Sequence, residues 1–245
     1  MNYKSNYNKL ASILKPLVPS GLRSTIRKSH QSYIFKKALK QFAKHQENIE
    51  NREDILIDLI YGWGNLGWSA MHSYLKKVLV EVNKTDGPIL ECGSGLSSIL
   101  MGIIAERRNL QLYSLEHQEV WANKVRTYQK EQGVTKAKVL TCPIVPYDNF
   151  DWYDVPMKDV PDNFSLIICD GPPAQTRGGR SGLLPVLAKK FAPKTLILFD
   201  DYSRKGEQEI VKEWKGKYDL TVSVHGEGDI YATIDFVQNE VPQNS

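Results

Sequence analysis

A glycine-rich turn follows the first short apolar run in the central part of the chain. The run and the turn read Ile-Leu-Glu91-Cys-Gly93-Ser94-Gly95-Leu-Ser97-Ser98. Glycines at 93 and 95 let a ligand approach the backbone closely, and a helix that starts after them would offer unpaired N–H groups. Ser98 stands where a nicotinamide-binding turn would have its third glycine, and no Lys-Ser/Thr pair follows the glycines, which excludes a phosphate-binding P-loop. Glu91 precedes the turn and could hold a cationic or zwitterionic ligand tail, which a pyrophosphate would not tolerate.

A second acidic residue, Glu116, ends the next apolar run, about twenty residues after the glycine turn. A carboxylate at the end of the second strand of such a fold can accept hydrogen bonds from both hydroxyls of a ribose. His117 follows directly, and it is equally consistent with a surface histidine and with a neighbour of an adenine ring. The two acidic residues and the turn together predict a nucleoside ligand with a charged tail.

Three more carboxylates, from Asp170, Asp200 and Asp201, follow later apolar runs. We expect them at the carboxyl ends of neighbouring strands, facing the ligand crevice. Three converging carboxylates repel one another unless a positive charge lies between them, and Mg²⁺ with oxygen ligands suits this set. The alternative is that Asp170 contacts the cofactor or the acceptor directly, Asp200 caps the next helix and Asp201 pairs with Arg204.

Catalytic and acceptor-binding residues are expected around the same crevice. Asp170 is the candidate general base for an acceptor hydroxyl. Arg177 and Arg180 could clamp an acidic acceptor through their forked donors, although loop arginines are also commonly solvated. Trp68 ends a segment of three glycines and three aromatic residues, 61–68, which could cover the pocket and place that ring on the acceptor.

Alternating apolar patterns predict the elements that position these residues. The predicted strands are residues 89–92, 112–115, 138–141, 164–169, 195–199, 220–224 and 230–236. The predicted helices are residues 32–45, 53–61, one starting after Ser69, 97–106, 119–132, 181–191 and 203–214. Strands alternating with helices predict an α/β fold with a doubly wound, Rossmann-like sheet of seven strands. Only five residues, 225–229, separate the last two strands, so we expect them to form an antiparallel hairpin.

The N-terminal part differs in charge from the rest. Residues 1–46 hold ten Lys or Arg and no Asp or Glu, which leaves 32 − 10 = 22 basic against 28 acidic residues in the remainder. We therefore divide the chain into a basic helical extension, 1–60, and a ligand-binding domain, 61–240. Ile34, Phe35, Leu39 and Phe42 lie on one stripe of the helix predicted at 32–45, and two partners for it stay open. The stripe lies on an anionic membrane surface, or it packs on the domain with the lysines in water.

Composition excludes several classes of protein. The acidic remainder does not suit a uniformly basic nucleic-acid binder, so we expect no nucleic-acid partner. Three cysteines without a CxxC pair favour reduced thiols over a zinc or disulfide site. No apolar run approaches the ~20 residues of a membrane span, and an apolar signal-peptide core is absent, so we expect a cytoplasmic protein, peripheral on the inner membrane face if the basic segment binds lipid.

The motif Glu91-x-Gly-x-Gly95, Glu116 and the antiparallel final strand together resemble class I S-adenosylmethionine-dependent methyltransferases, over about residues 60–236. The resemblance implies that Glu91 and the turn of Gly93, Ser94, Gly95 and Ser97 serve the methionine moiety of the cofactor. It implies that Glu116 serves the ribose and that Thr141-Cys142-Pro143 lines the adenine. The family often has a polar side chain where this chain has Cys142, so we expect backbone groups of Cys142 and Pro143 to recognise the adenine.

The resemblance also bears on the acceptor. Methyltransferases of this class that modify exocyclic amines carry Asn/Asp-Pro-Pro-aromatic after the fourth strand, whereas this chain has Asp170-Gly-Pro-Pro-Ala. Its acidic residues are similar to those of metal-dependent catechol-type O-methyltransferases, with Asp201 where that group has Asn. We therefore expect an S-adenosylmethionine-dependent O-methyltransferase, with Mg²⁺ at Asp170, Asp200 and Asp201, acting on a hydroxyl or acidic group of a small molecule or glycan. A lipid-linked surface polysaccharide is the acceptor favoured by the basic extension. The alternatives are an NAD-dependent oxidoreductase and a non-catalytic, methyltransferase-like partner subunit.

Overall fold

A computed structural model describes residues 20–64 and 72–238 of the chain. Its centre is a seven-stranded sheet in the order β3-β2-β1-β6-β7-β9-β8. The strands are β1 (Ile89–Cys92), β2 (Leu112–Glu116), β3 (Ala137–Thr141), β6 (Phe164–Cys169), β7 (Phe191–Phe199), β8 (Asp219–His225) and β9 (Tyr231–Val237). Strand β9 pairs antiparallel with both β7 and β8, and the other pairs are parallel. The predicted sheet and its reversed terminal strand are confirmed.

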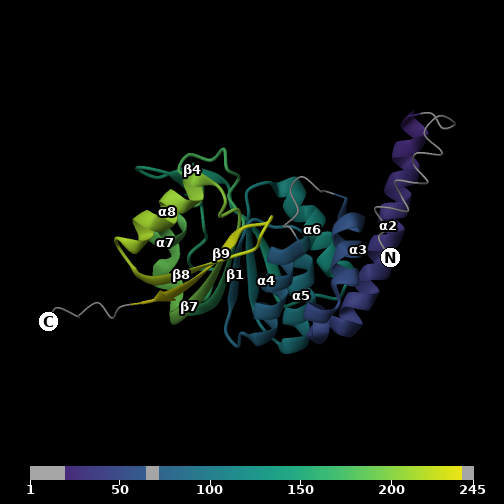
Figure 1. The fold of residues 1–245 in the computed structure, drawn as a ribbon, viewed down its shortest axis with the longest axis horizontal. Coiled ribbons are helices and arrows are strands. Elements are labelled where there is room, and N and C mark those ends of the chain that lie inside the picture. Colours follow the sequence, from purple (N-terminus) through teal and green to yellow (C-terminus); the bar gives the residue numbers. More distant parts are fainter. Residues whose placement is uncertain (1–19, 65–71, 239–245) are drawn as a thin grey trace.

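Helices cover both faces of this sheet, as Figure 1 shows. One face carries α4 (His72–Lys84), α5 (Leu96–Arg108) and α6 (Glu119–Glu131), and the other carries α7 (Leu183–Leu187) and α8 (Lys205–Lys215). Side chains alternate along β1, so Ile89 packs toward α4 and α5 while Leu90 and Cys92 pack toward the α7 face. Strand β1 lies between β2 and β6, where the direction of winding reverses, and this is where α/β sheets bind ligands.

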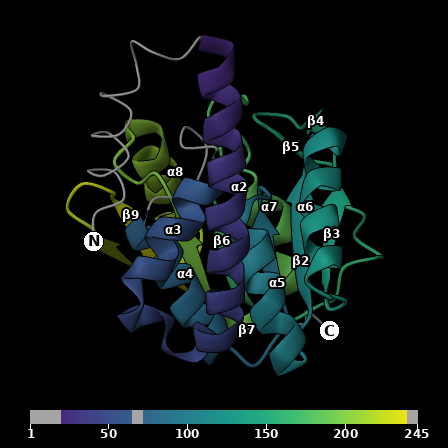
Figure 2. The same cartoon turned by 90° about the vertical axis from the view of Figure 1, so that its right-hand side faces the viewer.

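The N-terminal helices belong to the core on the α5 face. Helix α2 (Ser20–His45) leads through a short 3₁₀ helix, η1 (Gln46–Asn51), to α3 (Glu53–Trp63), and these helices lie outside α4 and α5 (Figure 2). The predicted stripe is buried: Phe35, Leu39 and Phe42 are each at most 2% exposed. Of the two partners left open, packing on the domain is therefore confirmed for these side chains. The helix also starts earlier than predicted, at Ser20 rather than residue 32.

Two other elements differ from the prediction. The helix expected over 181–191 is only the short α7, followed by a 3₁₀ turn, η2 (Ala188–Lys190), and Phe191 already belongs to β7. Phe191 pairs with Phe164 of β6, and its ring packs edge-on against Phe236 of β9, so strand pairing overrides the helical spacing there. A small antiparallel hairpin, β4 (Ile144–Pro146) and β5 (Asp151–Tyr153), follows β3, in a stretch for which no element was predicted. None of the helices in the described residues is both long enough and apolar enough to span a bilayer.

Candidate active site

The turns after β1 and β6 lie against each other at the centre of the sheet. The carbonyl oxygen of Cys92 accepts hydrogen bonds from Asp170 N at 3.1 Å and from Gly171 N at 2.7 Å. Gly93 has a φ of 88°, which favours glycine, and a Cβ there would lie 3.2 Å from Gly171 N. A Cβ at Gly171 would lie 3.0 Å from the Cα of Gly93, and 2.4 Å from the Tyr153 hydroxyl oxygen. Both glycines are therefore required for the two turns to approach this closely.

Glu91 is fully buried beneath the glycine turn. Its two carboxylate oxygens accept hydrogen bonds from the hydroxyls of Ser97 and Ser98 in the first turn of α5, at 2.5 Å each. Burial raises the pKa of Glu91 to about 7, although the serine hydroxyls partly oppose this shift. The structure thus gives Glu91 and Ser97 a part in shaping the turn, and their direct contact with a ligand stays a prediction.

Glu116 brings the end of β2 to the same turn. Its Oε2 accepts hydrogen bonds from Ser94 N at 3.2 Å and Ser94 Oγ at 2.9 Å. Its Oε1 accepts one from Gln118 N at 2.9 Å and lies 3.0 Å from His117 Nδ1. The carboxylate of Glu116, the Ser94 peptide and the His117 ring are therefore brought together, and the contact of Glu116 with a ribose stays a prediction.

A residue that the sequence analysis did not place in the site, Trp121, contacts this turn from α6. Its indole Nε1 donates a hydrogen bond to the Ser94 carbonyl oxygen at 2.7 Å. The same ring packs edge-on against Trp63 of α3, and the Lys124 ammonium lies over both rings. Its position on the buried side of a predicted helix was visible in the sequence, but its contact with the turn depends on how α6 docks.

The end of β3 lies beside Glu116. Cys142 N donates a hydrogen bond to the Glu116 carbonyl oxygen at 2.7 Å, and the Pro143 carbonyl oxygen accepts one from Asp154 N at 2.8 Å. The Cys142 side chain is buried, and burial raises the pKa of its thiol to about 12, so the thiol is neutral. The predicted adenine-binding segment is therefore next to the predicted ribose-binding carboxylate.

The predicted carboxylate cluster forms at the ends of β6 and β7. One oxygen from each of Asp170, Asp200 and Asp201 lies within 4.8 Å of the other two. Burial, with the charges of the other two carboxylates, raises the pKa of Asp200 to about 8, and burial also raises the pKa of Asp170. Asp200 does not cap α8, whose N-cap residue is Arg204, and its Oδ1 instead accepts a hydrogen bond from Asp201 N at 2.8 Å.

Arg180 lies inside this cluster and is only 2% exposed. Its Nη2 donates to Asp201 Oδ2 at 2.7 Å and to the Asp170 carbonyl oxygen at 2.7 Å, and it lies 3.4 Å from Asp170 Oδ1. Its Nη1 donates to the Asp200 carbonyl oxygen. Arg204 Nη1 lies 2.7 Å from the same Asp201 Oδ2, as the alternative to a metal site predicted. The carboxylates suit Mg²⁺ in type and spacing, but the buried Arg180 guanidinium already contacts those of Asp170 and Asp201, so this residue set does not fit a metal site as it stands.

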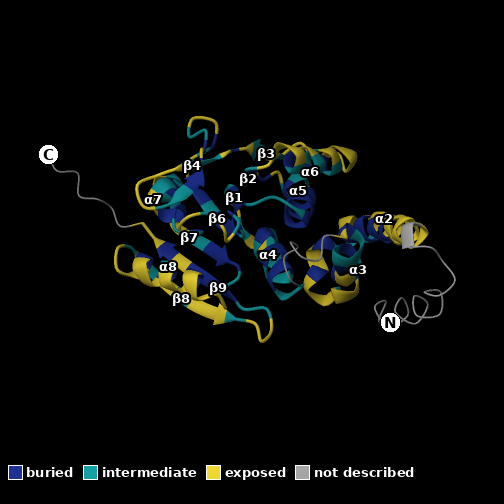
Figure 3. Ribbon diagram, turned by 90° about the horizontal axis from the view of Figure 1, so that it is seen from above, coloured by how far each residue is buried: buried dark blue, intermediate teal, exposed yellow. Residues whose placement is uncertain are grey.

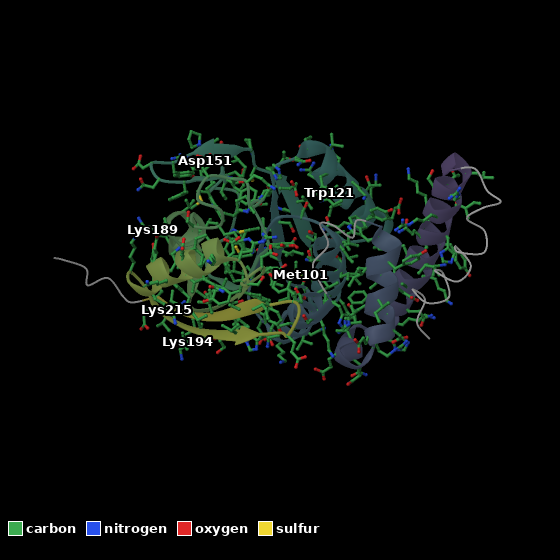
Figure 4. All side chains as sticks on the ribbon, turned by 45° about the horizontal axis from the view of Figure 1, so that its top comes forward. Met101, Trp121, Asp151, Lys189, Lys194 and Lys215 are labelled. Atoms are coloured by element: carbon green, nitrogen blue, oxygen red, sulfur yellow. The ribbon has the colours of Figure 1, made fainter. Side chains whose placement is uncertain are left out.

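The two remaining acceptor-binding candidates are placed differently. Arg177 binds the β4–β5 hairpin: its Nη2 lies 2.7 Å from Asp151 Oδ1 and 2.7 Å from the Tyr147 carbonyl oxygen. In Figure 4, Asp151 and Trp121 both lie in the upper part of the view. Trp68 lies outside the described residues, so its place over the pocket is not tested.

Comparisons with known proteins identify the fold. Neither the protein-family models nor the curated proteins include a match to this chain. Among solved structures, it is similar to the SAH-bound Podospora anserina methyltransferase PaMTH1, with 15% identity and a TM-score of 0.56 over 91% of this chain and 99% of that one. The chain has the class I methyltransferase fold. The SAH-bound N-terminal domain of human METTL16 shares this methyltransferase fold at 12% identity and a TM-score of 0.51, over 78% of this chain and 84% of that one. The precorrin-6y C5,15-methyltransferase of Geobacter metallireducens also shares the fold, with 11% identity and a TM-score of 0.52 over 69% of this chain and 90% of that one.

Proposed function

We propose that the chain is an S-adenosylmethionine-dependent O-methyltransferase. The observation that carries the proposal is the position of Glu116, whose carboxylate is held at the end of β2 against the Ser94 peptide of a glycine turn. Two carboxylate oxygens at that place suit the two hydroxyls of a ribose. The binding of SAH by two proteins of the same fold, PaMTH1 and METTL16, supports this choice of cofactor.

The reaction would be an in-line displacement in which the side chains bind, orient and accept a proton. S-adenosylmethionine supplies an activated methyl group when it is bound. Glu116 would hold the ribose and the turn at Gly93 would hold the methionine part, which together would orient the cofactor toward the acceptor. Asp170 would accept the proton of the attacking hydroxyl, since burial raises its pKa toward that of a useful base. The methyl group would pass to the acceptor oxygen, and the electron pair of the broken carbon–sulfur bond would stay on sulfur.

The expected Mg²⁺ is not part of this proposal, because Arg180 already contacts the carboxylates of Asp170 and Asp201, and Arg204 also contacts that of Asp201. The acceptor that we propose is a hydroxyl or acidic group of a small molecule or glycan. A lipid-linked glycan is favoured over a soluble one by the basic residues of the N-terminal segment.

The first test is a calorimetric titration of the full chain with S-adenosylhomocysteine and, separately, with NAD⁺. We expect heat of binding with the first compound and none with the second. The reverse result would support the NAD-dependent oxidoreductase. Since both compounds share an adenosine, the comparison tests the tail of the ligand and not the adenine site alone.

The second test separates an enzyme from a non-catalytic partner subunit. Transfer of labelled methyl from S-adenosylmethionine is measured on isolated lipid-linked glycans and on small catechols, with the wild type and with Asp170→Asn. We expect transfer to the glycans, lost in the variant, while its affinity for S-adenosylhomocysteine is kept. Cofactor binding without transfer to either acceptor class would favour the partner subunit.

A further inference from the structure

Two glycines turn the chain so that Arg180 points into the protein. Gly178 and Gly179 both have left-handed backbones, with φ of 76° and 54°, and a Cβ at Gly178 would lie 2.6 Å from the Cβ of Phe150. The residue that follows is thereby directed under the ends of β6 and β7, where the guanidinium carbon lies 5.5 Å from the centre of the Phe199 ring. This loop geometry holds the Arg180 side chain inside the protein, whereas an arginine on a solvated loop would be mobile.

The donors of Arg180 are aimed at both strand ends. One nitrogen, Nη2, contacts the carbonyl oxygen of Asp170 and the carboxylate of Asp201, while Nη1 contacts the carbonyl oxygen of Asp200. Main-chain carbonyl oxygens cannot move away without moving their strands, so they fix the guanidinium plane. A divalent cation that used the same carboxylates would have to displace a buried cation with these partners.

We propose that the Arg180 guanidinium takes the place that a divalent cation would hold among Asp170, Asp200 and Asp201, so that the cluster is complete without a metal. Arg180 is then a positioning residue: it holds the Asp170 and Asp201 carboxylates in place and supplies the positive charge that keeps them together. The inference concerns the cluster alone and holds whichever cofactor the crevice binds.

Mn²⁺ is the probe that tests this, because its electron paramagnetic resonance signal reports binding directly, without an acceptor substrate. We expect the wild-type chain to take up no Mn²⁺ up to about 1 mM. Arg180→Ala removes the guanidinium and should create a Mn²⁺ site, with affinity at least about tenfold higher than in the wild type. Addition of Asp200→Asn should abolish that site, and Mn²⁺ should raise the melting temperature of Arg180→Ala but not of the wild type.

The matched control is Arg177→Ala, which removes an arginine bound to Asp151, outside the cluster, and should gain no Mn²⁺ site. Wild-type binding of Mn²⁺ that is lost in Asp200→Asn would overturn the proposal, as would a folded Arg180→Ala that takes up no Mn²⁺. If Arg180→Ala does not fold, the wild-type titration still decides. Arg180→Lys then tests whether both guanidinium nitrogens are needed. One ammonium cannot reach all of these partners, so we expect the Arg180→Lys variant to fold with a lower melting temperature than the wild type.

A second inference rests on the outward face of α2. Leu22, Ile26 and Tyr33 are 54%, 54% and 66% exposed, and their helical spacing places them on one stripe, opposite the buried Phe35 and Phe42. The same outward face continues toward the C-terminal end of α2 with exposed lysines, namely Lys36, Lys37, Lys40 and Lys44. Figure 3 shows that the N-terminal part of α2 is largely exposed and lies at the edge of the molecule.

The geometry points to an anionic lipid bilayer as the partner of this α2 face. Three exposed apolar side chains beside a row of lysines match a surface with negative headgroups over an apolar interior. The absence of Asp and Glu from residues 1–46 adds to the charge complementarity. The buried stripe of α2 takes no part, since it is already in the core.

Co-sedimentation with vesicles tests this partner. We expect the full chain to sediment with phosphatidylcholine vesicles that contain phosphatidylglycerol and not with pure phosphatidylcholine. Lys40→Glu/Lys44→Glu should weaken this binding about tenfold, and Leu22→Ser/Ile26→Ser should weaken it as well. The control is Lys212→Glu/Lys215→Glu on the exposed side of α8, at the other end of the molecule (Figure 1). Equal sedimentation with neutral vesicles, or an equal loss in the α8 variant, would overturn the proposal.

Discussion

The two glutamates next to the glycine turn differ in what surrounds their carboxylates. Glu91 accepts hydrogen bonds from the hydroxyls of Ser97 and Ser98, and it is completely buried. Glu116 is held by two main-chain amides, Ser94 N and Gln118 N, and by the Ser94 hydroxyl. The first carboxyl therefore favours its neutral form, whereas the second is arranged as an acceptor of hydrogen bonds.

The raised pKa of Glu91 predicts a pH dependence of stability. Its pKa is about 7 in the folded chain against an ordinary value of 4.5, so its contribution to stability is complete below about pH 4.5 and is lost as the pH rises to about 7. Glu91→Gln is neutral at every pH. The free energy of unfolding of this variant, relative to the wild type, should therefore increase by about 3 kcal/mol between about pH 4.5 and pH 8. Urea unfolding at both pH values measures this, and an unchanged difference would show that Glu91 titrates normally.

Glu116 predicts an effect on ligand affinity. Glu116→Gln keeps the shape of the side chain but removes its charge, so hydrogen bonds from ribose hydroxyls become weaker. The affinity for S-adenosylhomocysteine should fall by about 1.5–3 kcal/mol, roughly 10- to 100-fold, by calorimetry. Glu106→Gln is the matched control, because Glu106 also accepts main-chain hydrogen bonds, from Thr135 and Lys136, away from the glycine turn. An equal loss in both variants would count against a ribose contact.

Among the elements, α6 is the one that fixes the glycine turn from outside the sheet. Trp121→Phe keeps an aromatic ring against Trp63 but removes the hydrogen bond to the Ser94 carbonyl oxygen. We expect a loss of about 1 kcal/mol in unfolding free energy and a several-fold weaker binding of S-adenosylhomocysteine. Trp214→Phe of α8 removes a similar bond, to the Ser181 carbonyl oxygen at 3.3 Å, and should leave the affinity unchanged. Unchanged affinity in Trp121→Phe would limit this tryptophan to packing.

The elements also show where sequence periodicity suffices. Helices α5, α6 and α8 have continuous helical patterns and agree with the prediction to within a few residues. Leu183, Leu184, Leu187 and Phe191 have helical spacing too, yet the last of them is in β7. Its pairing with Phe164, twenty-seven residues away in the chain, is a long-range contact that a local pattern does not contain.

The candidate site shows the same limit at the level of the whole molecule. Glu91, Glu116 and the three aspartates were found from the sequence, because strand ends of a parallel sheet meet at one edge. The burial of Arg180 could not be predicted from the sequence, because it depends on two consecutive left-handed glycines and on the docking of β7 beside β6. The contact of Trp121 with the turn likewise depends on tertiary packing.

The packing of the whole molecule predicts that the N-terminal helices unfold together with the sheet. Phe42 is 0% exposed and belongs to the same buried cluster as Leu79 of α4 and Ile104 of α5. Phe42→Ala should lower the free energy of unfolding by about 3–5 kcal/mol, whereas Lys44→Ala, on the exposed face of the same helix, should change it by less than about 0.5 kcal/mol.

The number of transitions decides whether residues 1–60 form a unit of their own. If the core is continuous, tryptophan fluorescence and far-UV circular dichroism give one coincident transition in Phe42→Ala, shifted to lower urea. Hydrogen exchange should then show that α2 and the central strand β6 lose protection in parallel. If the boundary at residue 60 separates two folding units, α2 and α3 melt first and the amides of β6 keep their wild-type protection. That second pattern would support the predicted division at residue 60. We expect the first pattern, because a helix that shares the core cannot unfold without exposing the apolar side chains of α4 and α5.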